Sequence, residues 1–135
     1  MIAKIQMATR IVLGLIYFVF GGMGLAIAFG LMPMPAQPMP AAAEGFMKGI
    51  MGSGYFFTLL KITETSCGFL LLSGIAAPLA LAILAPITLN IILFHAWLTP
   101  AAQNLMLPSA MLLAHIVAMS AYWSLYKPLL LRKKV

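Results

Sequence analysis

The sequence predicts an all-α membrane protein, a single domain over residues 1–135 in which four transmembrane helices form a bundle. One observation is composition: 64% of the residues are hydrophobic, 7% are charged and the mean hydropathy is +1.08. Soluble domains contain about 45–50% apolar and about 25% charged residues. The other observation is four apolar segments, each near the ~20 residues that cross a ~30 Å hydrocarbon core. They cover residues 11–32, 55–74, 79–98 and 105–127.

The first segment is expected to be a retained helix that packs through small residues. Lys4 and Arg10 precede it as in a signal peptide, but its apolar run exceeds the ~7–15 residues of a signal h-region. Small residues recur along it and predict a flat stripe, on which Tyr17 also lies and against which another helix packs closely. The glycines predicted to make such contacts, one of them in the second segment, are Gly14, Gly21, Gly24 and Gly68.

A proline-rich outer loop follows the first segment. Four prolines in residues 33–40 favour extended chain. The next stretch, AAAEGFMKGIM, gathers apolar residues on one side and spaces Glu44 and Lys48 four apart, so we expect a short amphipathic helix at the outer interface. Methionine thioethers bind Cu(I), and Met34 and Met39 are the candidates for it. Because no Cys or His stands among them, an apolar lid is the favoured role.

The later segments contain signals for a kink and for helix ends. Pro86 lies inside 79–98 and predicts a kink, because it removes one backbone hydrogen bond. Pro108 suits the first turn of the fourth helix. Three aromatic residues predict that this helix ends at the membrane interface: Tyr122, Trp123 and Tyr126.

Positive charge gathers near the two chain ends. Six of the eight basic residues flank the first and last segments: Lys4, Arg10, Lys127, Arg132, Lys133 and Lys134. The positive-inside rule therefore predicts that both termini are cytoplasmic, as an even number of spans permits. The net charge of +6 indicates contact with anionic lipid headgroups rather than nucleic-acid binding. The single cysteine, Cys67, excludes an intrachain disulfide and an internal dithiol pair.

Strongly polar side chains lie inside the last three segments, and we predict that they form a ligand or proton site. They are Lys61, Glu64, Asn90, His95 and His115. With helices alternating in direction, Glu64, Asn90 and His115 fall near the bilayer centre. Lys61 and Glu64 share one face of their helix and can pair. An unpaired charge there costs about 2.5–3.5 kcal/mol, so the two must be paired or hydrated, or Glu64 must be protonated. Asn90 and His95 are about 140° apart around their helix, so they cannot both face one point unless Pro86 distorts the turn. The alternative is a hydrogen-bonded clasp that fixes helix register without a ligand.

The stretch GYFFTLLKITETSCGFLLLSGIAAPLALAILAPITLNIILFHAWLTP resembles the DoxX family of small bacterial inner-membrane proteins. The family pattern is Lys-x-x-Glu-x-x-Gly-Gly followed by Asn-x-x-x-Phe-His, and it is matched at Lys61, Glu64, Gly68, Asn90, Phe94 and His95. The sequence departs from it at Cys67, where Gly is usual, and at Ile75-Ala76, where an Arg often follows. The resemblance covers nearly the whole chain, including the methionine- and proline-rich outer loop of one subgroup. It implies a four-helix bundle with both termini inside the cell.

Three functions are compatible with these patterns. The first is what the resemblance implies, because some family members are associated with membrane redox complexes: an accessory subunit of a membrane redox system, linked to quinones or thiols. It would bind a quinone or a lipid between its helices beside redox-complex partner proteins. In it Lys61 and His95 donate hydrogen bonds, Glu64 and His115 accept protons and Asn90 orients the ligand. The second is an assembly or scaffolding protein without catalysis of its own. The third is a small transporter or copper-handling protein. Whether the chain is an enzyme, and whether it forms a homo-oligomer, the sequence leaves open.

Overall fold

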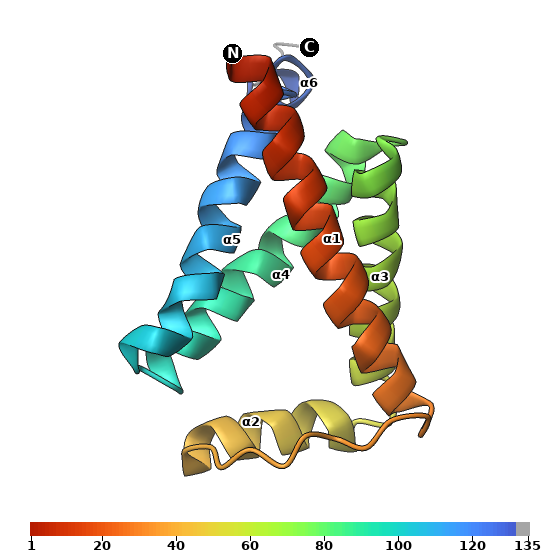
Figure 1. Cartoon of the computed structure of the whole chain (residues 1–135), viewed down its shortest axis with the longest axis vertical. Helices are drawn as coiled ribbons and strands as arrows, with labels where there is room; N and C mark the ends of the chain where they lie inside the picture. The colour runs from red at the N-terminus through yellow and green to blue at the C-terminus, as the bar shows by residue number, and fades with distance from the viewer. Residues whose placement is uncertain (132–135) are drawn as a thin grey trace.

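The computed structural model describes residues 1–131, and these form six helices with no strand among them (Figure 1). The helices are α1 (Ile2–Ala28), α2 (Ala41–Gly52), α3 (Phe56–Ser73), α4 (Ala77–Trp97), α5 (Ala102–Ser120) and α6 (Trp123–Leu130). Four of them, α1, α3, α4 and α5, are long and apolar enough to cross a membrane. The chain is therefore a multi-pass membrane protein, as the sequence predicts. The predicted basic tail residues Arg132, Lys133 and Lys134 lie outside the described residues.

The first membrane helix is longer at its start and shorter at its end than the predicted 11–32. It begins at Ile2, because residues 2–10 contain no glycine or proline that would break a helix. It ends at Ala28, where Gly30 takes a left-handed φ of 71°. The amide of Gly30 donates to the carbonyl of Ile27, and the amide of Leu31 donates to that of Ala26. This pair of bonds is a Schellman motif, which satisfies carbonyls at the helix end.

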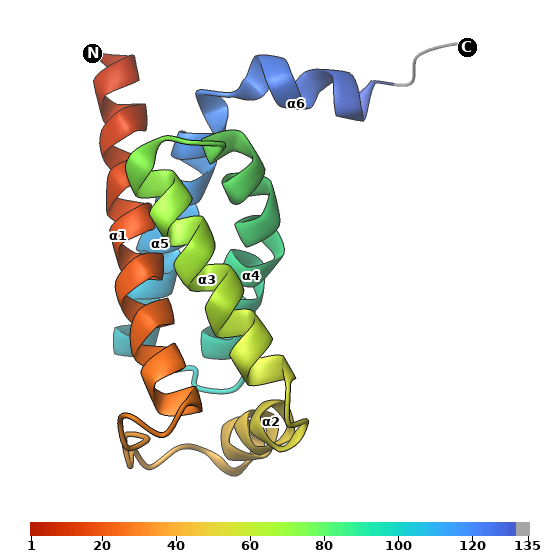
Figure 2. The same cartoon turned by 90° about the vertical axis from the view of Figure 1, so that its right-hand side faces the viewer.

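The predicted fourth helix, 105–127, is wrong at both ends. α5 begins at Ala102, so Pro108 lies two turns inside the helix and not in its first turn. The side-chain amide of Asn104 donates to the carbonyl of Thr99 at a distance of 3.1 Å and ties this early start to the preceding turn. The helix then breaks at residues 121–122, and α6 runs away from the bundle axis (Figure 2).

The short helix α6 is attached to the first turn of α4. The hydroxyl of Tyr126 donates to the carbonyl oxygen of Pro78 at 2.5 Å. Burial raises the pKa of Tyr126, and the nearby Tyr122 adds to this shift. The phenol is therefore neutral at physiological pH and remains a hydrogen-bond donor.

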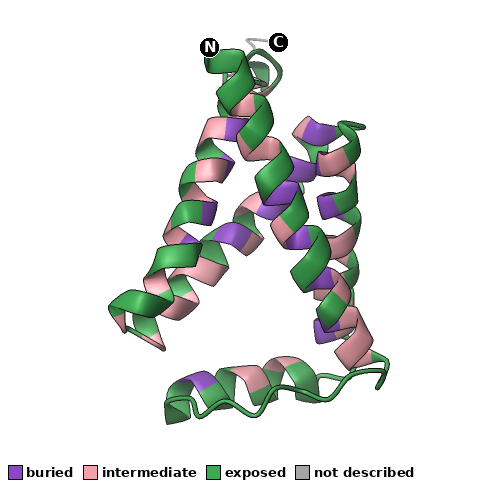
Figure 3. Cartoon of the chain, in the orientation of Figure 1, coloured by how far each residue is buried: buried purple, intermediate pink, exposed green. Residues whose placement is uncertain are grey.

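The four membrane helices meet at one end of the bundle and diverge toward the other. α1 packs against α3, and α4 packs against α5. The two pairs lie close together near the N-terminus and α6, whereas they separate toward α2 (Figure 1). Buried residues follow the inner faces of the helices (Figure 3), and the core includes Leu13, Leu71, Leu81 and Leu84. At most 28% of the most apolar window of each helix is buried, so most of the apolar surface faces lipid.

Glycines allow α1 and α3 to approach closely. A Cβ atom at any of four positions would overlap the facing helix: Gly14, Gly21, Gly24 and Gly68. At Gly68 that atom would collide with the backbone of Phe18, and at Gly21 it would lie 2.6 Å from Oγ1 of Thr65. In lipid, helices associate through such close packing, because the solvent supplies no hydrophobic drive between them.

Helix α2 lies across the divergent end of the bundle (Figure 1). Pro40 precedes it in an extended conformation, with φ −55° and ψ 147°, and the prolines before it keep residues 33–40 out of any helix. On the helix surface Lys48 and Glu44 form an ion pair at 2.6 Å, and the hydrogen bond and charge of Lys48 lower the pKa of Glu44. Phe46 packs against Phe94 of α4 with ring centroids 5.5 Å apart, which links α2 to the membrane helices.

Candidate functional site

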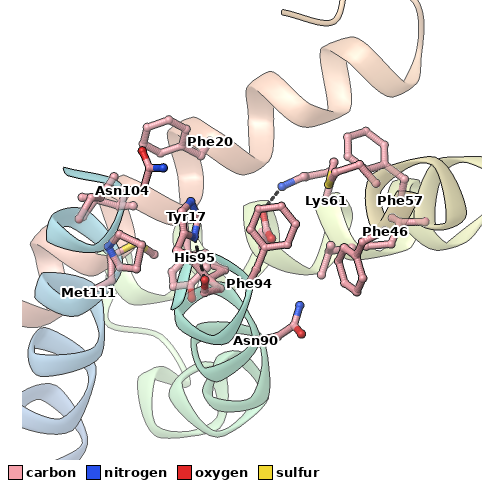
Figure 4. Close-up of a pocket in the computed structure, with 18 of the residues that line it drawn as sticks. Tyr17, Phe20, Phe46, Phe57, Lys61, Asn90, Phe94, His95, Asn104 and Met111 are labelled. Atoms are coloured by element: carbon pink, nitrogen blue, oxygen red, sulfur yellow. Dashed lines mark hydrogen bonds and ion pairs between the residues drawn. The ribbon is translucent and has the colours of Figure 1, made fainter. Parts of the chain in front are cut away.

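A cavity of about 500 Å³ lies between α1, α3, α4 and α5 on the side of the bundle that α2 covers (Figure 4). Most of its lining is aliphatic or aromatic. The polar lining residues are Tyr17, Lys61, Glu64, Asn90, His95, Gln103 and Asn104. Four of the five residues predicted from the sequence therefore line one cavity, and His115 does not.

Lys61 and Glu64 form the charged part of the cavity wall. Nζ of Lys61 donates to Oε2 of Glu64 at 2.7 Å, with side-chain exposures of 19% and 5%. A spacing of three residues places both on one face of α3. Nζ also lies 5.7 Å from the ring centroid of Phe57, a cation–π contact. Of the states that the sequence leaves open for these two charges, the structure shows the ion pair.

Asn90 and His95 both line the cavity, although they are about 140° apart around an ideal helix. The cavity is wide enough to touch α4 over more than one turn, and Ile91 and Phe94 line it as well. Nδ1 of His95 lies 2.8 Å from the carbonyl oxygen of Ile91, which fixes the orientation of the ring. A shared cavity, unlike a shared point of contact, does not require residues on one narrow face.

His115 belongs to a separate buried cluster with Tyr17 and Thr88. Its Nε2 donates to the carbonyl of Leu81 at 3.0 Å, so in the neutral ring Nδ1 is an acceptor. The Thr88 hydroxyl lies 2.7 Å from this Nδ1 and 2.6 Å from the Tyr17 hydroxyl. All three side chains are at most 2% exposed. We call them the Tyr17–Thr88–His115 cluster; it joins α1, α4 and α5 with every one of these polar groups hydrogen-bonded.

Thr88 and the cavity residues of α5 are absent from the predicted site. A threonine in a membrane helix usually bonds its own backbone, and Oγ1 of Thr88 also lies 3.0 Å from the carbonyl oxygen of Leu84, although its one proton is donated to Nδ1 of His115. The sequence therefore gives no signal for the contacts of Thr88 with the other helices. Gln103 and Asn104 lie before the predicted fourth helix, which begins at residue 105, whereas α5 begins at Ala102. Tyr17, by contrast, was predicted to face the bundle, and its burial confirms this.

A second cavity of about 490 Å³ lies between the proline-rich segment and the start of α5. It shares Phe94, His95 and Asn104 with the first cavity, so these residues separate the two spaces. The buried hydroxyl of Thr99, which also lines it, has no hydrogen-bond partner in the described part of the chain. His95 is thus in contact with both the interior of the bundle and the loop side.

The methionine candidates for copper lie in the proline-rich segment. Met34 and Met39 are 40% and 37% exposed, and Met39 lines the second cavity. Within residues 1–131, no group of three or more His, Cys, Asp or Glu side chains is placed to hold a metal ion. Cys67 is a buried free thiol.

Comparison of the chain with protein-family models, with curated proteins and with solved structures gives no match. The relation to the DoxX family therefore stays a prediction that rests on the motif residues. Of these, Lys61, Glu64, Asn90, Phe94 and His95 all line the first cavity.

Proposed function

We propose that the chain is a DoxX-like accessory subunit of a membrane redox system and that it binds a quinone-like ligand in the first cavity. The observation that carries the proposal is the cavity itself: about 500 Å³ of largely apolar space with a few convergent polar groups. Ligand sites are typically 300–1,000 Å³ and have this kind of lining. Ionisable residues inside a membrane are costly and usually mark ligand or proton pathways.

The polar groups match the chemistry of such a ligand. Aromatic and aliphatic side chains supply surfaces for a flat ring, and Lys61 supplies N–H donors beyond the one that it gives to Glu64. Glu64 retains a second carboxylate oxygen that can accept a proton, and the Asn90 amide orients the bound molecule. His115 has no role in this site, because its cluster satisfies both of its ring nitrogens.

The proposal includes an orientation in the bacterial inner membrane with both termini in the cytoplasm. It is supported by Lys4, Arg10 and Lys127, which belong to the two helices at the converging end of the bundle. The acidic residues, Glu44 and Glu64, belong to the half that contains the cavity and α2. By the positive-inside rule the converging end faces the cytoplasm, and α2 then lies at the outer interface.

A ligand titration with two tryptophan variants of α4 tests the proposal. Decylbenzoquinone is added to the purified protein in detergent, and thermal unfolding is followed. At a hundred times its dissociation constant, a ligand stabilises the folded state by about 2.7 kcal/mol. Ile91→Trp fills the cavity, whereas Leu89→Trp replaces an exposed leucine that does not line it. We expect stabilisation in the wild type and in Leu89→Trp, and none in Ile91→Trp.

Two results would contradict this function. Absence of quinone from the lipid extract of the purified protein, together with no stabilisation by the added quinone, excludes a quinone site. Co-purification of partner proteins that is lost in Glu64→Gln, without any quinone binding, would instead support the scaffolding function.

A further inference from the structure

The tautomer of His95 defines what the cavity can bind at this position. Nδ1 lies 2.8 Å from the carbonyl oxygen of Ile91. A carbonyl only accepts hydrogen bonds, so Nδ1 carries the proton. In the neutral ring Nε2 is then a bare acceptor, and it has no hydrogen-bond partner within residues 1–131. This reverses the role predicted from the sequence, in which His95 is a donor.

Helix α3 supplies hydrogen-bond donors to the cavity, whereas His95 supplies an acceptor. Lys61 gives one N–H to Glu64, and an ammonium group has three, so two remain for a ligand. The cavity therefore presents the free N–H groups of Lys61 from α3 and the acceptor Nε2 of His95 from α4, in addition to the second oxygen of Glu64 and the amide of Asn90. Phe94 and Phe57 belong to its apolar lining (Figure 4). A ligand that fits both must carry an acceptor near Lys61 and a hydroxyl or N–H donor near His95.

We infer that the cavity recognises an aromatic hydroxyl group, and that it binds the reduced hydroquinone in preference to the oxidised quinone. This inference rests on the proposed function. A hydroquinone donates one O–H to Nε2 of His95 and accepts from Lys61 with its other oxygen. A quinone has only acceptor oxygens. Its carbonyl oxygen cannot form a hydrogen bond with Nε2 of His95, because both atoms are acceptors. When the quinone is bound, Nε2 of His95 is left without a hydrogen bond in an apolar site. This weakens the binding of the quinone about tenfold relative to the hydroquinone.

The first test uses three probes on the wild-type protein and needs no variant. Dissociation constants of decylhydroquinone, its dimethyl ether and decylbenzoquinone are measured by calorimetry in the absence of oxygen. The hydroquinone should bind about tenfold more tightly than the other two. The ether keeps the ring and the oxygen atoms but has lost the donor hydrogens, so it separates hydrogen bonding from ring contact.

The second test locates the preference at His95. In His95→Phe the acceptor is absent, and the hydroquinone and quinone should bind with nearly equal affinity. In His95→Gln, which stays polar, the amide can donate or accept, and the preference should also fall to near parity. Thr63→Val removes a polar group of α3 that does not line the cavity and should keep the tenfold preference.

The outcomes separate this inference from the function beneath it. If the wild type binds quinone, hydroquinone and ether equally, or if His95→Phe keeps the preference, the inference is overturned and the ligand site stands. If none of the three probes binds the wild type, the proposed function itself fails.

Discussion

At the scale of single residues, the polar side chains inside the membrane divide into two groups with different tasks. Lys61 and Glu64 neutralise each other at 2.7 Å but keep unused donors and an unused oxygen at a cavity. In the Tyr17–Thr88–His115 cluster both hydroxyl protons and both ring nitrogens of His115 are used within the protein. A hydrogen-bonded clasp and the proposed ligand site, which the sequence offers as alternatives, are therefore compatible with each other in one bundle.

Removing one partner of the Lys61–Glu64 pair should cost more than removing both. Lys61→Met leaves a carboxylate in an apolar wall, where Glu64 is 4% exposed, and we expect a loss of about 2–3 kcal/mol in the free energy of unfolding. The double variant Lys61→Met/Glu64→Gln contains no charge to neutralise and should lose less than Lys61→Met alone. Thermal unfolding in detergent, arranged as a double-mutant cycle, measures the coupling. Additive losses would show that the two side chains do not depend on each other.

The Thr88 hydroxyl should contribute to stability, whereas a matched hydroxyl on the lipid side should not. Thr88→Val keeps the shape but leaves the Tyr17 hydroxyl and Nδ1 of His115 without their partner. We expect a loss of about 1–2 kcal/mol, the upper range for polar contacts in bilayers. Thr63 bonds only its own helix backbone, at Leu59, so Thr63→Val should change stability by less than about 0.5 kcal/mol. If the two variants changed stability equally, the hydrogen bonds of Thr88 to Tyr17 and His115 would not stabilise the bundle.

At the scale of helices, α1 and α3 approach so closely at Gly68 that the backbone of one helix faces the backbone of the other. A Cβ atom at Gly68 of α3 would collide with the amide nitrogen of Phe18, whereas a Cβ atom at Gly22 of α1 would have nothing within 4 Å. Two glycines with the same local conformation therefore differ entirely in what they face. A comparison of glycine-to-alanine substitutions at these two positions therefore tests helix packing.

Gly68→Ala should separate α1 from α3, and Gly22→Ala should not. The added methyl group at Gly68 would overlap the backbone of Phe18, and backbone cannot move away as a flexible side chain does. Overpacking of this kind costs about 1–3 kcal/mol. At Gly22 the methyl group meets open space, so stability should be unchanged or slightly higher. The melting temperatures of the two variants are measured in detergent, and that of Gly68→Ala should be lower. Similar values would contradict the packing role of Gly68.

The number and approximate position of the membrane helices could be predicted because hydropathy is a property of local sequence. Helix ends could not, because they depend on local hydrogen bonds such as that from Asn104 to Thr99. The Lys61–Glu64 pair was predictable from their spacing on one helix. The partner of His115 was not, because Thr88 lies 27 residues away and only the packing of α4 on α5 brings them together.

At the scale of the whole molecule, the bundle has one packed end and one open end. The core residues Leu13, Leu71 and Ala118 are fully buried, and the side chains of Gln6 and Ser120 join α1 to α5 beside them at 3.0 Å. Toward α2 the helices diverge around the cavity (Figure 1). The proposed ligand site belongs to the open half, and these fully buried core residues belong to the packed half.

The orientation of the bundle in the membrane can be tested by labelling single cysteines on its two ends. Cys67 is buried and is replaced by Ser, after which single cysteines are introduced at Gln37, in the proline-rich segment, and at Lys127, in α6. With four spans these positions lie on opposite sides of the membrane, because α6 follows the last span and residue 37 follows the first. A membrane-impermeant thiol reagent added to intact spheroplasts should label Gln37→Cys and should leave Lys127→Cys unlabelled until the membrane is opened. Labelling of Lys127→Cys alone would reverse the orientation, and labelling of both in intact spheroplasts would contradict the arrangement of four spans.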